Sequence, residues 1–302
     1  MGKTAFIFPG QGSQYVGMGK DFYESYPEAQ EIFDIAEQAS GLPVKEICFT
    51  ENEKINITEY TQIAMLATEI ALWKVLDSKG IKADITAGLS LGEYAALAAA
   101  HVLEPEDLFR IIKCRGKYMQ DAYPVGGAMT AVLGLDGDTI CRACEETEGI
   151  VSVANFNCPR QIVISGEQGA VNAAAEKLAE AGAKRCVPLK VSGPFHSQLM
   201  RKAGEQLADE LAKADFKAPQ IPYISNVEAT LVTESAPVAD LLIRQVSGSV
   251  CWQQTIEQMI AMGVTTFVEI GPGKSLTGFV KKISRDVTCI NIDKLEDLEK
   301  LA

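Results

Sequence analysis

The amino-acid sequence predicts an α/β protein with a parallel-sheet core and a smaller inserted unit. Short apolar runs such as residues 4–8 alternate with longer helical stretches, which is typical of buried parallel strands linked by helices. Residues 88–92 read Gly-Leu-Ser-Leu-Gly, where one such run meets the next helix. From Gly126 the order changes to strand, helix, two strands, helix and strand, which indicates a ferredoxin-like unit between two α/β halves.

Composition and charge exclude several classes of protein. The 302 residues are 47% hydrophobic and 23% charged, as in a globular chain rather than a disordered one or a membrane bundle. A net charge of −12 opposes broad binding to nucleic acid or anionic lipid. The apolar run after Lys3 is too short for a secretory signal or a membrane span, and the eight scattered cysteines suit a reducing compartment. We therefore expect a cytoplasmic protein that binds neither nucleic acid nor membrane.

The first part of the chain begins with a strand and a tight loop. The strand at 4–8 ends in Pro-Gly-Gln-Gly, whose proline and glycines favour a turn. After a helix-rich stretch, Thr58 is the expected N-cap of a helix over 60–76, and Gly80 is its expected stop. The next expected elements are a strand at 85–89, a helix of small residues at 91–101 and an amphipathic helix at 106–120.

The inserted unit and the last part of the chain follow. Within the insertion, strands are expected at 128–135, 151–154, 161–165 and 186–191, and helices at 139–147 and 170–181. Beyond it, the pattern predicts helices at 197–214, 239–246 and 253–262 and strands at 221–225 and 266–270. The prediction is a large domain of residues 1–125 and 194–302 with a small domain of residues 126–193.

Ser90 is the strongest candidate for a nucleophile. In the pattern G-x-S-x-G the glycines allow a strained elbow between strand and helix, which lifts the serine hydroxyl out of the sheet. The N–H of the following residue, Leu91, then lies at a helix N-terminus, where it can bind a developing anion. The strand before Ser90 and the helix after it are both visible in the sequence, which supports this interpretation.

The chain has two histidines, and they predict different roles. His101 ends the helix that begins beside Ser90, so it is interpreted as a cap on the helix dipole. His196 lies between an expected strand and an expected helix, at the same kind of sheet edge as Ser90. A helix N-terminus disfavours the imidazolium, which would keep His196 neutral and able to accept the serine proton. The alternative for His196 is an ordinary loop histidine.

Arg115 falls on the apolar stripe of the helix at 106–120. A guanidinium on a buried face requires an anion. The residues alone leave two candidates for this anion. It is either a carboxylate of the protein core, in a salt bridge, or the carboxylate of a substrate, held by two parallel hydrogen bonds.

Metal and nucleotide chemistry have little support in the sequence. Cys141 and Cys144 form the one close cysteine pair, but they fall in a helical stretch with no second such pair and no histidine nearby, so we expect no metal site. The loop at 10–12 lacks the third glycine of a dinucleotide fingerprint, and no phosphate-loop lysine is present. We expect no cofactor.

Four motifs, taken in order, resemble the malonyl-CoA:acyl-carrier-protein transacylase family of fatty-acid and polyketide synthesis. They are FPGQGSQ at 8–14, GLSLGEY at 88–94, GPFHS at 193–197 and EIGPG at 269–273, and the match extends to about residue 283. The resemblance implies an α/β-hydrolase-like large domain and a ferredoxin-like small domain. It also implies ping-pong transfer of a malonyl group from malonyl-CoA, a substrate rather than a cofactor, to the phosphopantetheine thiol of acyl carrier protein.

The resemblance implies roles for individual residues as well. Ser90 would be the nucleophile, His196 the base and Arg115 the malonyl-binding arginine. The remaining implied roles are the backbone amides of Gln11 and Leu91 as oxyanion hole, the carbonyl of Gln245 as orienter of the histidine, and Gln62, Asn155 and Phe195 as substrate-binding residues. A ring at the position of Phe195 crowds a methyl branch on the substrate, which favours malonyl over methylmalonyl groups.

The sequence departs from the family pattern at two positions. Leu89 stands where the family usually has histidine before the serine, and Ile63 replaces the proline of a Thr-Gln-Pro-Ala turn. Neither position carries the nucleophile, the base or an oxyanion donor, so the departures concern fine positioning.

Other functions remain open from the sequence. A malonyl transferase of a polyketide pathway would share all these residues. A serine thioesterase or hydrolase would use the same elbow but would need an acid after the serine to hold the base, for which Asp121, Asp136 and Asp138 are candidates. A noncatalytic carrier-docking module is opposed by the intact serine and histidine. Basic residues late in the chain would suit an acidic carrier or coenzyme A phosphates if they border the pocket: Lys184, Arg185, Lys190, Lys274, Lys281 and Lys282.

Overall fold

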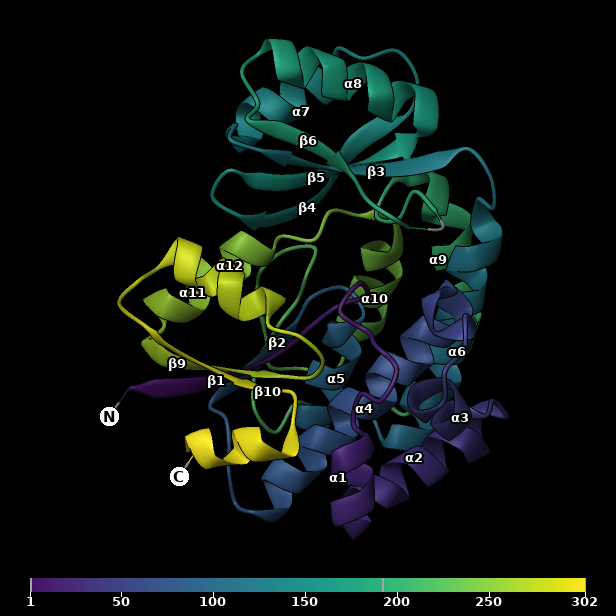
Figure 1. The fold of residues 1–302 in the computed structure, drawn as a ribbon, viewed down its shortest axis with the longest axis vertical. Coiled ribbons are helices and arrows are strands. Elements are labelled where there is room, and N and C mark those ends of the chain that lie inside the picture. The colour runs from purple at the N-terminus through teal and green to yellow at the C-terminus, as the bar shows by residue number, and fades with distance from the viewer. Residues whose placement is uncertain (1, 192, 302) are drawn as a thin grey trace.

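The computed structural model describes residues 2–191 and 193–301, and its larger sheet confirms the α/β class. This sheet has six strands in the order β10-β9-β1-β2-β7-β8, parallel except for the pairing of β7 with β8. The strands are β1 (Lys3–Phe8), β2 (Ile85–Gly88), β7 (Tyr223–Ile224), β8 (Leu231–Val232), β9 (Val264–Ile270) and β10 (Thr288–Ile292). In Figure 1 this sheet occupies the lower half of the molecule, with both termini near β10 and β1.

Helices cover both faces of the larger sheet, which explains the unbroken apolar run of β1. Phe6 and Phe8 pack in one core cluster with α4 and α5, whereas Ala5 and Ile7 pack in a second cluster with α11 and α12. A central parallel strand buried on both faces needs apolar side chains in both directions. The helices around this sheet are α1 (Lys20–Ser25), α2 (Pro27–Ser40), α3 (Val44–Phe49), α4 (Thr58–Ser78), α5 (Gly92–Ala99), α6 (Pro105–Ala122), α9 (Arg201–Leu211), α10 (Val238–Ser247), α11 (Trp252–Ala261) and α12 (Ser275–Ile283).

The second sheet has four antiparallel strands in the order β4-β5-β3-β6. Its elements follow one another as β3 (Gly127–Leu133), α7 (Gly137–Glu145), β4 (Val151–Cys158), β5 (Gln161–Glu167), α8 (Gln168–Glu180) and β6 (Arg185–Pro188). Figure 1 shows α7 and α8 on the face that points away from the larger sheet. The other face therefore looks toward the larger sheet.

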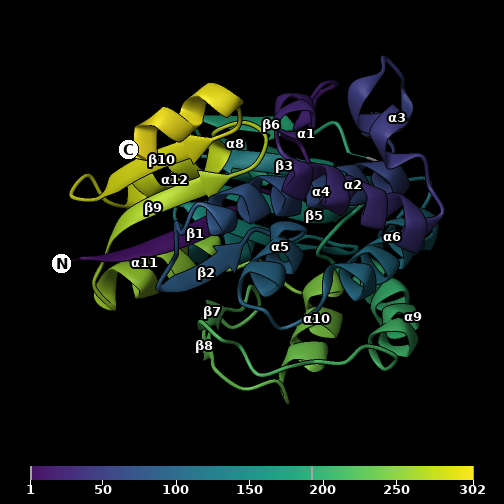
Figure 2. The ribbon, with the colours of Figure 1, turned by 90° about the horizontal axis from the view of Figure 1, so that it is seen from below.

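The two sheets are joined next to the loop that follows α10. Asn155 of β4 forms a bridge with Val250, and Phe156 N–H donates to the Val250 carbonyl at 2.9 Å. Ser249 Oγ donates to the carbonyl of Val153 at 2.6 Å. Seen from below in Figure 2, α9 and α10 lie side by side near β7 and β8, far from the chain termini.

Several expected boundaries were wrong. Helix α4 begins at Thr58 itself with Ile57 as N-cap, because Ile57 already has extended backbone angles, so the predicted Thr58 cap is not formed. Gly80 does follow the helix end, with a positive φ of 76° that suits glycine. The expected helix at 197–214 divides into a 3₁₀ turn at Gln198–Met200 and the shorter α9.

Strand lengths in both sheets also differ from expectation. β4 continues to Cys158 because its second half pairs with both β5 and the segment at Val250. β6 ends at Pro188, and β7 keeps only two residues of the expected strand at 221–225. β8, α12 and β10 were not predicted from the sequence.

Cysteine and membrane expectations can be compared with the described residues. Cys141 and Cys144 lie on α7, and all eight cysteines are free thiols. Within residues 2–191 and 193–301, no three His, Cys, Asp or Glu side chains are grouped to hold a metal ion. In the same residues, no helix has both the length and the apolar character needed to cross a membrane.

Candidate active site

Ser90 lies at a tight corner between β2 and α5 with a positive φ of 54°. The flanking glycines are required by close packing. A Cβ on Gly88 would come within 1.9 Å of the Gly92 carbonyl group, and one on Gly92 would come within 2.2 Å of the Phe8 carbonyl oxygen. The second approach holds the corner against the end of β1, where the loop with Gln11 begins. The G-x-S-x-G pattern thus reflects two backbone contacts that no larger residue permits.

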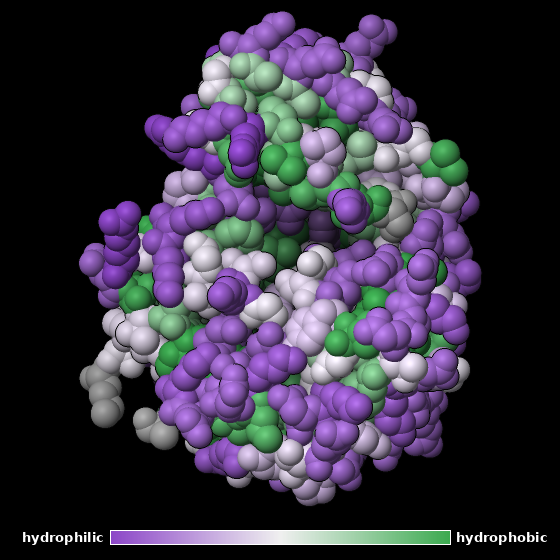
Figure 3. Space-filling view, viewed as in Figure 1, coloured by the Kyte–Doolittle hydropathy of each residue, from purple (hydrophilic) through white to green (hydrophobic). Residues whose placement is uncertain are grey.

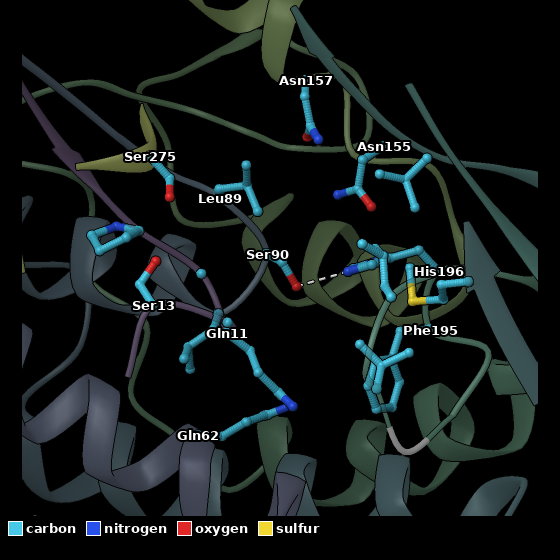
Figure 4. Close-up of a pocket in the computed structure, with 18 of the residues that line it drawn as sticks. Gln11, Ser13, Gln62, Leu89, Ser90, Asn155, Asn157, Phe195, His196 and Ser275 are labelled. Atoms are coloured by element: carbon cyan, nitrogen blue, oxygen red, sulfur yellow. Dashed lines mark hydrogen bonds between the residues drawn. The ribbon is translucent and has the colours of Figure 1, made fainter. Parts of the chain in front are cut away.

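His196 lies across the corner from Ser90. Its Nε2 is 2.7 Å from Ser90 Oγ, the contact drawn as a dashed line in Figure 4, and its Nδ1 is 2.8 Å from the Gln245 carbonyl oxygen. Since a carbonyl only accepts hydrogen bonds, Nδ1 carries the ring hydrogen and Nε2 is left to accept from the serine hydroxyl. Burial, together with the nearby charge of Arg115, lowers the pKa of His196 to about 4. The imidazole is therefore neutral at pH 7.

Arg115 of α6 is buried, with 1% of its surface exposed, beside both residues. Its guanidinium donates to Gln62 Oε1 at 2.7 Å, to Gln245 Oε1 at 2.9 Å and to Ser90 Oγ at 3.2 Å. No carboxylate forms an ion pair with it among the described residues, so the alternative of a core salt bridge is not found. Its Nε has no hydrogen-bond partner in the described structure. A buried cation held only by neutral groups is suited to bind an anion.

A cavity of about 240 Å³ connects these groups. Figure 3 shows it as the hollow between the upper and lower halves of the molecule. We call the side formed by the larger sheet and its loops the floor; its members include Gln11, Gln62, Ser90, Leu91, Arg115, Phe195 and His196. We call the side formed by the smaller sheet the roof; its members are Met129, Asn155, Asn157 and Val163. Every site residue predicted from the sequence lines the cavity except Gln245, which lies directly behind it.

Two backbone amides of the floor lie beside Ser90. The N–H groups of Gln11 and Leu91 have no acceptor among the described residues, whereas Ser90 N–H donates to Asn226 Oδ1 at 2.6 Å. The Gln11 side chain is turned away to donate to Thr58 Oγ1 at 3.1 Å. Free amides at a helix N-terminus and in a turn are the groups that stabilise an oxyanion.

The two departures from the family pattern occupy apolar surroundings. Leu89 lines the cavity, as does Phe279, and packs against the core cluster of α11 and α12. Ile63 is fully buried on α4. Neither side chain has a polar group to disturb the hydrogen bonds of Ser90.

The remaining candidates lie away from the cavity. His101 follows the end of α5 with a positive φ of 56° and packs edge-on against Trp73. Burial lowers the pKa of His101, so its surroundings disfavour the charged form that a dipole cap requires. The acids considered for a hydrolase are exposed: Asp121 pairs with Lys117, Asp136 caps α7 and Asp138 follows it.

The structure adds three residues that the sequence analysis missed. Asn226 bonds to both sides of the corner, accepting from Ser90 N–H and donating to the Gly88 carbonyl at 2.6 Å. Glu93 is buried in the first turn of α5. Asn157 shares the roof with Asn155 (Figure 4), and its buried Oδ1 has no partner among the described residues. Asn226 lies two residues beyond the short strand β7, and a polar residue near the carboxyl end of a parallel strand was the available signal.

The parallel sheet and the serine–histidine corner are compatible with an enzyme that transfers acyl groups. The chain belongs to the acyl transferase domain family, whose model matches residues 5–294. It is 44% identical to the malonyl CoA-acyl carrier protein transacylase of Bacillus subtilis over 304 residues, covering 99% of this chain and 96% of that protein. The resemblance that the four motifs predicted is thereby confirmed.

Solved structures of malonyl transacylases are similar to this chain over nearly its whole length. The crystal structure of a malonyl transacylase, MCAT, from Streptococcus pneumoniae matches with a TM-score of 0.96 and 45% identity, covering 99% of each chain. A complex of a malonyl-transacylase with its holo type II polyketide-synthase acyl-carrier protein matches with a TM-score of 0.95 and 39% identity, covering 99% of this chain and 98% of that one.

Proposed function

We propose that the protein transfers a malonyl group from malonyl-CoA to the phosphopantetheine thiol of acyl carrier protein through a malonyl ester of Ser90. One observation carries the proposal: the Ser90–His196 pair and the buried guanidinium of Arg115 meet at the same hydroxyl, inside one cavity. A nucleophile is thus placed beside a cation that suits the distal carboxylate of a malonyl group. The names of the relatives in bacteria support this substrate and acceptor.

Acylation begins when His196 Nε2 accepts the proton of Ser90 Oγ as the oxygen attacks the thioester carbonyl. The carbonyl oxygen becomes an anion, which the N–H groups of Gln11 and Leu91 stabilise. As the tetrahedral intermediate collapses, the carbon–sulfur bond breaks and the proton on His196 passes to the departing coenzyme A sulfur. The products are free coenzyme A and malonyl-Ser90.

Transfer reverses the same sequence with a different thiol. The phosphopantetheine thiol of the carrier gives its proton to His196, and its sulfur attacks the ester carbonyl of malonyl-Ser90. The ester bond breaks, and His196 returns the proton to Ser90 Oγ. The Gln245 carbonyl favours the required tautomer throughout by accepting the Nδ1 hydrogen, so no aspartate is needed.

Substrate choice rests on Arg115 and Phe195. Arg115 would bind the malonyl carboxylate, helped by Gln62, which already orients the guanidinium. Phe195 is nearly buried and borders the cavity next to the base, where its ring would crowd a methyl group at the α-carbon. The native protein should therefore prefer malonyl-CoA to both acetyl-CoA and methylmalonyl-CoA.

The pantetheine arms of both substrates would enter between floor and roof. Asn155 offers an amide there, and Leu189 and Val191 add apolar surface after β6. The basic residues divide between two elements: Lys184, Arg185 and Lys190 accompany β6, and Lys274, Lys281 and Lys282 accompany α12, whose Ser275, Leu276 and Phe279 line the cavity. Such positive edges suit the phosphates of coenzyme A and an acidic carrier.

We also propose that the architecture is that of an α/β-hydrolase-like large domain, residues 1–125 and 194–302, with a ferredoxin-like small domain at 126–193. The order β4-β5-β3-β6 and the two helices on one face support the second description. Residues 1, 192 and 302 lie outside the described part of the chain. The pathway proposed is fatty-acid synthesis in the cytoplasm, without a cofactor. A polyketide carrier would be served by the same chemistry.

The experiment that tests this function measures where the acyl group goes. The protein is mixed with malonyl-CoA and holo acyl carrier protein, and malonyl-carrier and free malonate are quantified together. A transferase forms malonyl-carrier much faster than malonate. Malonate as the main product would favour the hydrolase, although none of its candidate acids reaches His196 in the structure.

A further inference from the structure

Behind the catalytic pair and outside the cavity lining, one buried oxygen accepts hydrogen bonds from two residues. Glu93 Oε2 accepts a hydrogen bond from Gln245 Nε2 at 2.6 Å and another from the Asn226 backbone N–H at 3.3 Å. Glu93 is 1% exposed, Asn226 is 1% exposed and Gln245 is fully buried. The mechanism above uses none of the Glu93 atoms, so this carboxyl group needs another explanation.

The Gln245 side chain can satisfy its neighbours in only one orientation. Its Nε2 has two hydrogens, and they go to Glu93 Oε2 and to the Ser90 carbonyl at 2.8 Å. Its Oε1 is then left to accept from Arg115 Nη2 at 2.9 Å. A flipped amide would place oxygen against two acceptors and the NH₂ group against the guanidinium, so all three hydrogen bonds would be lost.

We infer that Glu93 is a positioning residue for malonyl recognition: by accepting from Gln245 Nε2, it fixes the amide orientation that holds Arg115 in the cavity. Within residues 2–191 and 193–301, Arg115 forms no ion pair with a carboxylate, and its other side-chain acceptors are Gln62 Oε1 and the reacting oxygen of Ser90. A guanidinium held by one amide fewer would be free to turn away from the position that meets the malonyl carboxylate. The inference rests on the proposed function, because it concerns the same substrate group.

The role of Glu93 requires an acceptor rather than a charge. Burial raises the pKa of Glu93 to about 8. The hydrogen bonds from Gln245 and Asn226 and the positive charge of Arg115 act in the opposite direction, but they do not cancel the effect of burial. Its Oε1 has no partner among the described residues, so that oxygen can carry a proton while Oε2 continues to accept. A glutamine at this position would keep the accepting oxygen, whereas a methionine of similar length would not.

The test compares malonyl and acetyl transfer in variants of the full chain. The measured quantity is the ratio of kcat/KM for malonyl-CoA to kcat/KM for acetyl-CoA, with holo acyl carrier protein as acceptor. E93M should lower this ratio by about tenfold or more, whereas E93Q should stay within about threefold of the native ratio. Acetyl transfer does not use the Arg115 contact, so it serves as an internal measure of an intact serine–histidine pair.

A double substitution tests whether Glu93 acts through Gln245. Q245M removes the relaying amide but keeps the backbone carbonyl that holds His196. It should lower the ratio on its own, and E93M should add little in the Q245M background, because residues that act as one unit are not additive. If E93M does not fold, as judged by its thermal unfolding, Q245M and E93Q decide the matter by themselves.

Glu69 provides a matched control. It is a second fully buried glutamate, on α4, and among the described residues its carboxyl oxygens have no hydrogen-bond partner, so it forms no hydrogen bond with Arg115 or Gln245. E69M should leave the ratio within about threefold of native, because it removes a buried carboxyl of the same size away from Gln245.

The outcomes separate this inference from the proposed function. If the native protein prefers malonyl-CoA and a folded E93M keeps that preference, or loses both activities equally, the role of Glu93 is wrong while the function stands. The role of Glu93 would also be wrong if Q245M left the malonyl-to-acetyl ratio unchanged. The same holds if the fold-losses of E93M and Q245M multiplied in the double variant. A native protein with no malonyl preference would contradict both proposals.

Discussion

The floor and the roof of the cavity differ in chemistry. The floor carries the proposed nucleophile Ser90, the proposed base His196 and the cation Arg115, held by buried hydrogen bonds at a tight strand-to-helix corner. The roof carries no charge at the cavity; it offers the amides Asn155 and Asn157 and apolar side chains on a separate antiparallel sheet. Under the proposed function, the floor performs the reaction and the roof accommodates the thioester arm. Substitutions in the two regions should therefore affect different kinetic constants.

The largest effect is expected at the nucleophile. Ser90→Ala removes the oxygen that forms the ester, and loss of a serine that acts with a base costs on the order of a millionfold in turnover. Steady-state transfer to holo carrier protein measures this. Full activity in Ser90→Ala would place the nucleophile elsewhere and remove the distinction between floor and roof.

Arg115→Ala should lose malonyl transfer by roughly ten- to a thousandfold. A charge-assisted hydrogen bond contributes about 1.5–3 kcal/mol and an unpaired buried charge costs about 3–5 kcal/mol, at about 1.4 kcal/mol for each factor of ten. Acetyl transfer should stay level or rise, because a neutral acyl group no longer meets a buried cation. The measurement is kcat/KM for each thioester in competition. An equal loss of both activities would show that Arg115 supports the fold or coenzyme A instead.

The pH dependence of acylation should report the base of the floor. Because the pKa of His196 is lowered to about 4, the neutral form dominates above that pH. The acylation rate should rise with pH through about 4, by about tenfold per unit below it, and be level from about 5 to 8. Rapid-mixing measurements of single-turnover acylation test this.

The charge of Arg115 is one cause of the low pKa of His196, so the two predictions are linked. In Arg115→Ala the rising part of the pH profile should move to higher pH, because the opposing positive charge is gone. A profile that moves to lower pH, or a native midpoint above the ordinary value for histidine of about 6.5, would contradict the burial of the base beside a cation.

A roof substitution should have a smaller effect on a different constant. Asn155→Ala removes one neutral hydrogen-bonding group, worth about 0.5–1.5 kcal/mol, so we expect a loss of about two- to tenfold in kcat/KM. The loss should appear mainly in KM, with kcat nearly native, since the reacting atoms lie on the floor. A kcat that falls as far as in a floor variant would show that the two regions are not separable.

The smallest effect is expected at His101, which belongs to neither side of the cavity. His101→Ala should leave transfer within about twofold of native, as for a surface change without a partner at the site. If His101→Ala were more damaging than His196→Ala, the assignment of the base would be wrong.

Local features of the site were predictable because short-range geometry determines them. Gly88 and Gly92 are required by backbone contacts within a few residues of Ser90 and with the end of β1, so the pattern is visible in the sequence. Arg115 was predictable because a charged residue in an apolar helical stripe conflicts with its surroundings. His196 could be found because only two histidines are present.

The rest of the site depends on contacts between distant parts of the chain. Asn226 is 136 residues from Ser90, and Gln245 is 152 residues from Glu93. No local sequence pattern therefore predicts the hydrogen bonds between them. The resemblance to a known family identified Gln245 but not Glu93 or Asn226. The start of α4 was also misplaced: Ile57 has the extended backbone angles of the N-cap, and the Thr58 N–H donates to the distant Gln120 Oε1, a contact the local sequence does not encode.

The most direct measurement is the intact mass of the protein after mixing with malonyl-CoA in the absence of a carrier. The account predicts one added malonyl group, located by peptide mapping to the segment that contains Ser90, and its removal when holo acyl carrier protein is added. Acetyl-CoA under the same conditions should give much less adduct. A label on another peptide, or no covalent adduct despite full transfer to the carrier, would contradict the serine-ester mechanism.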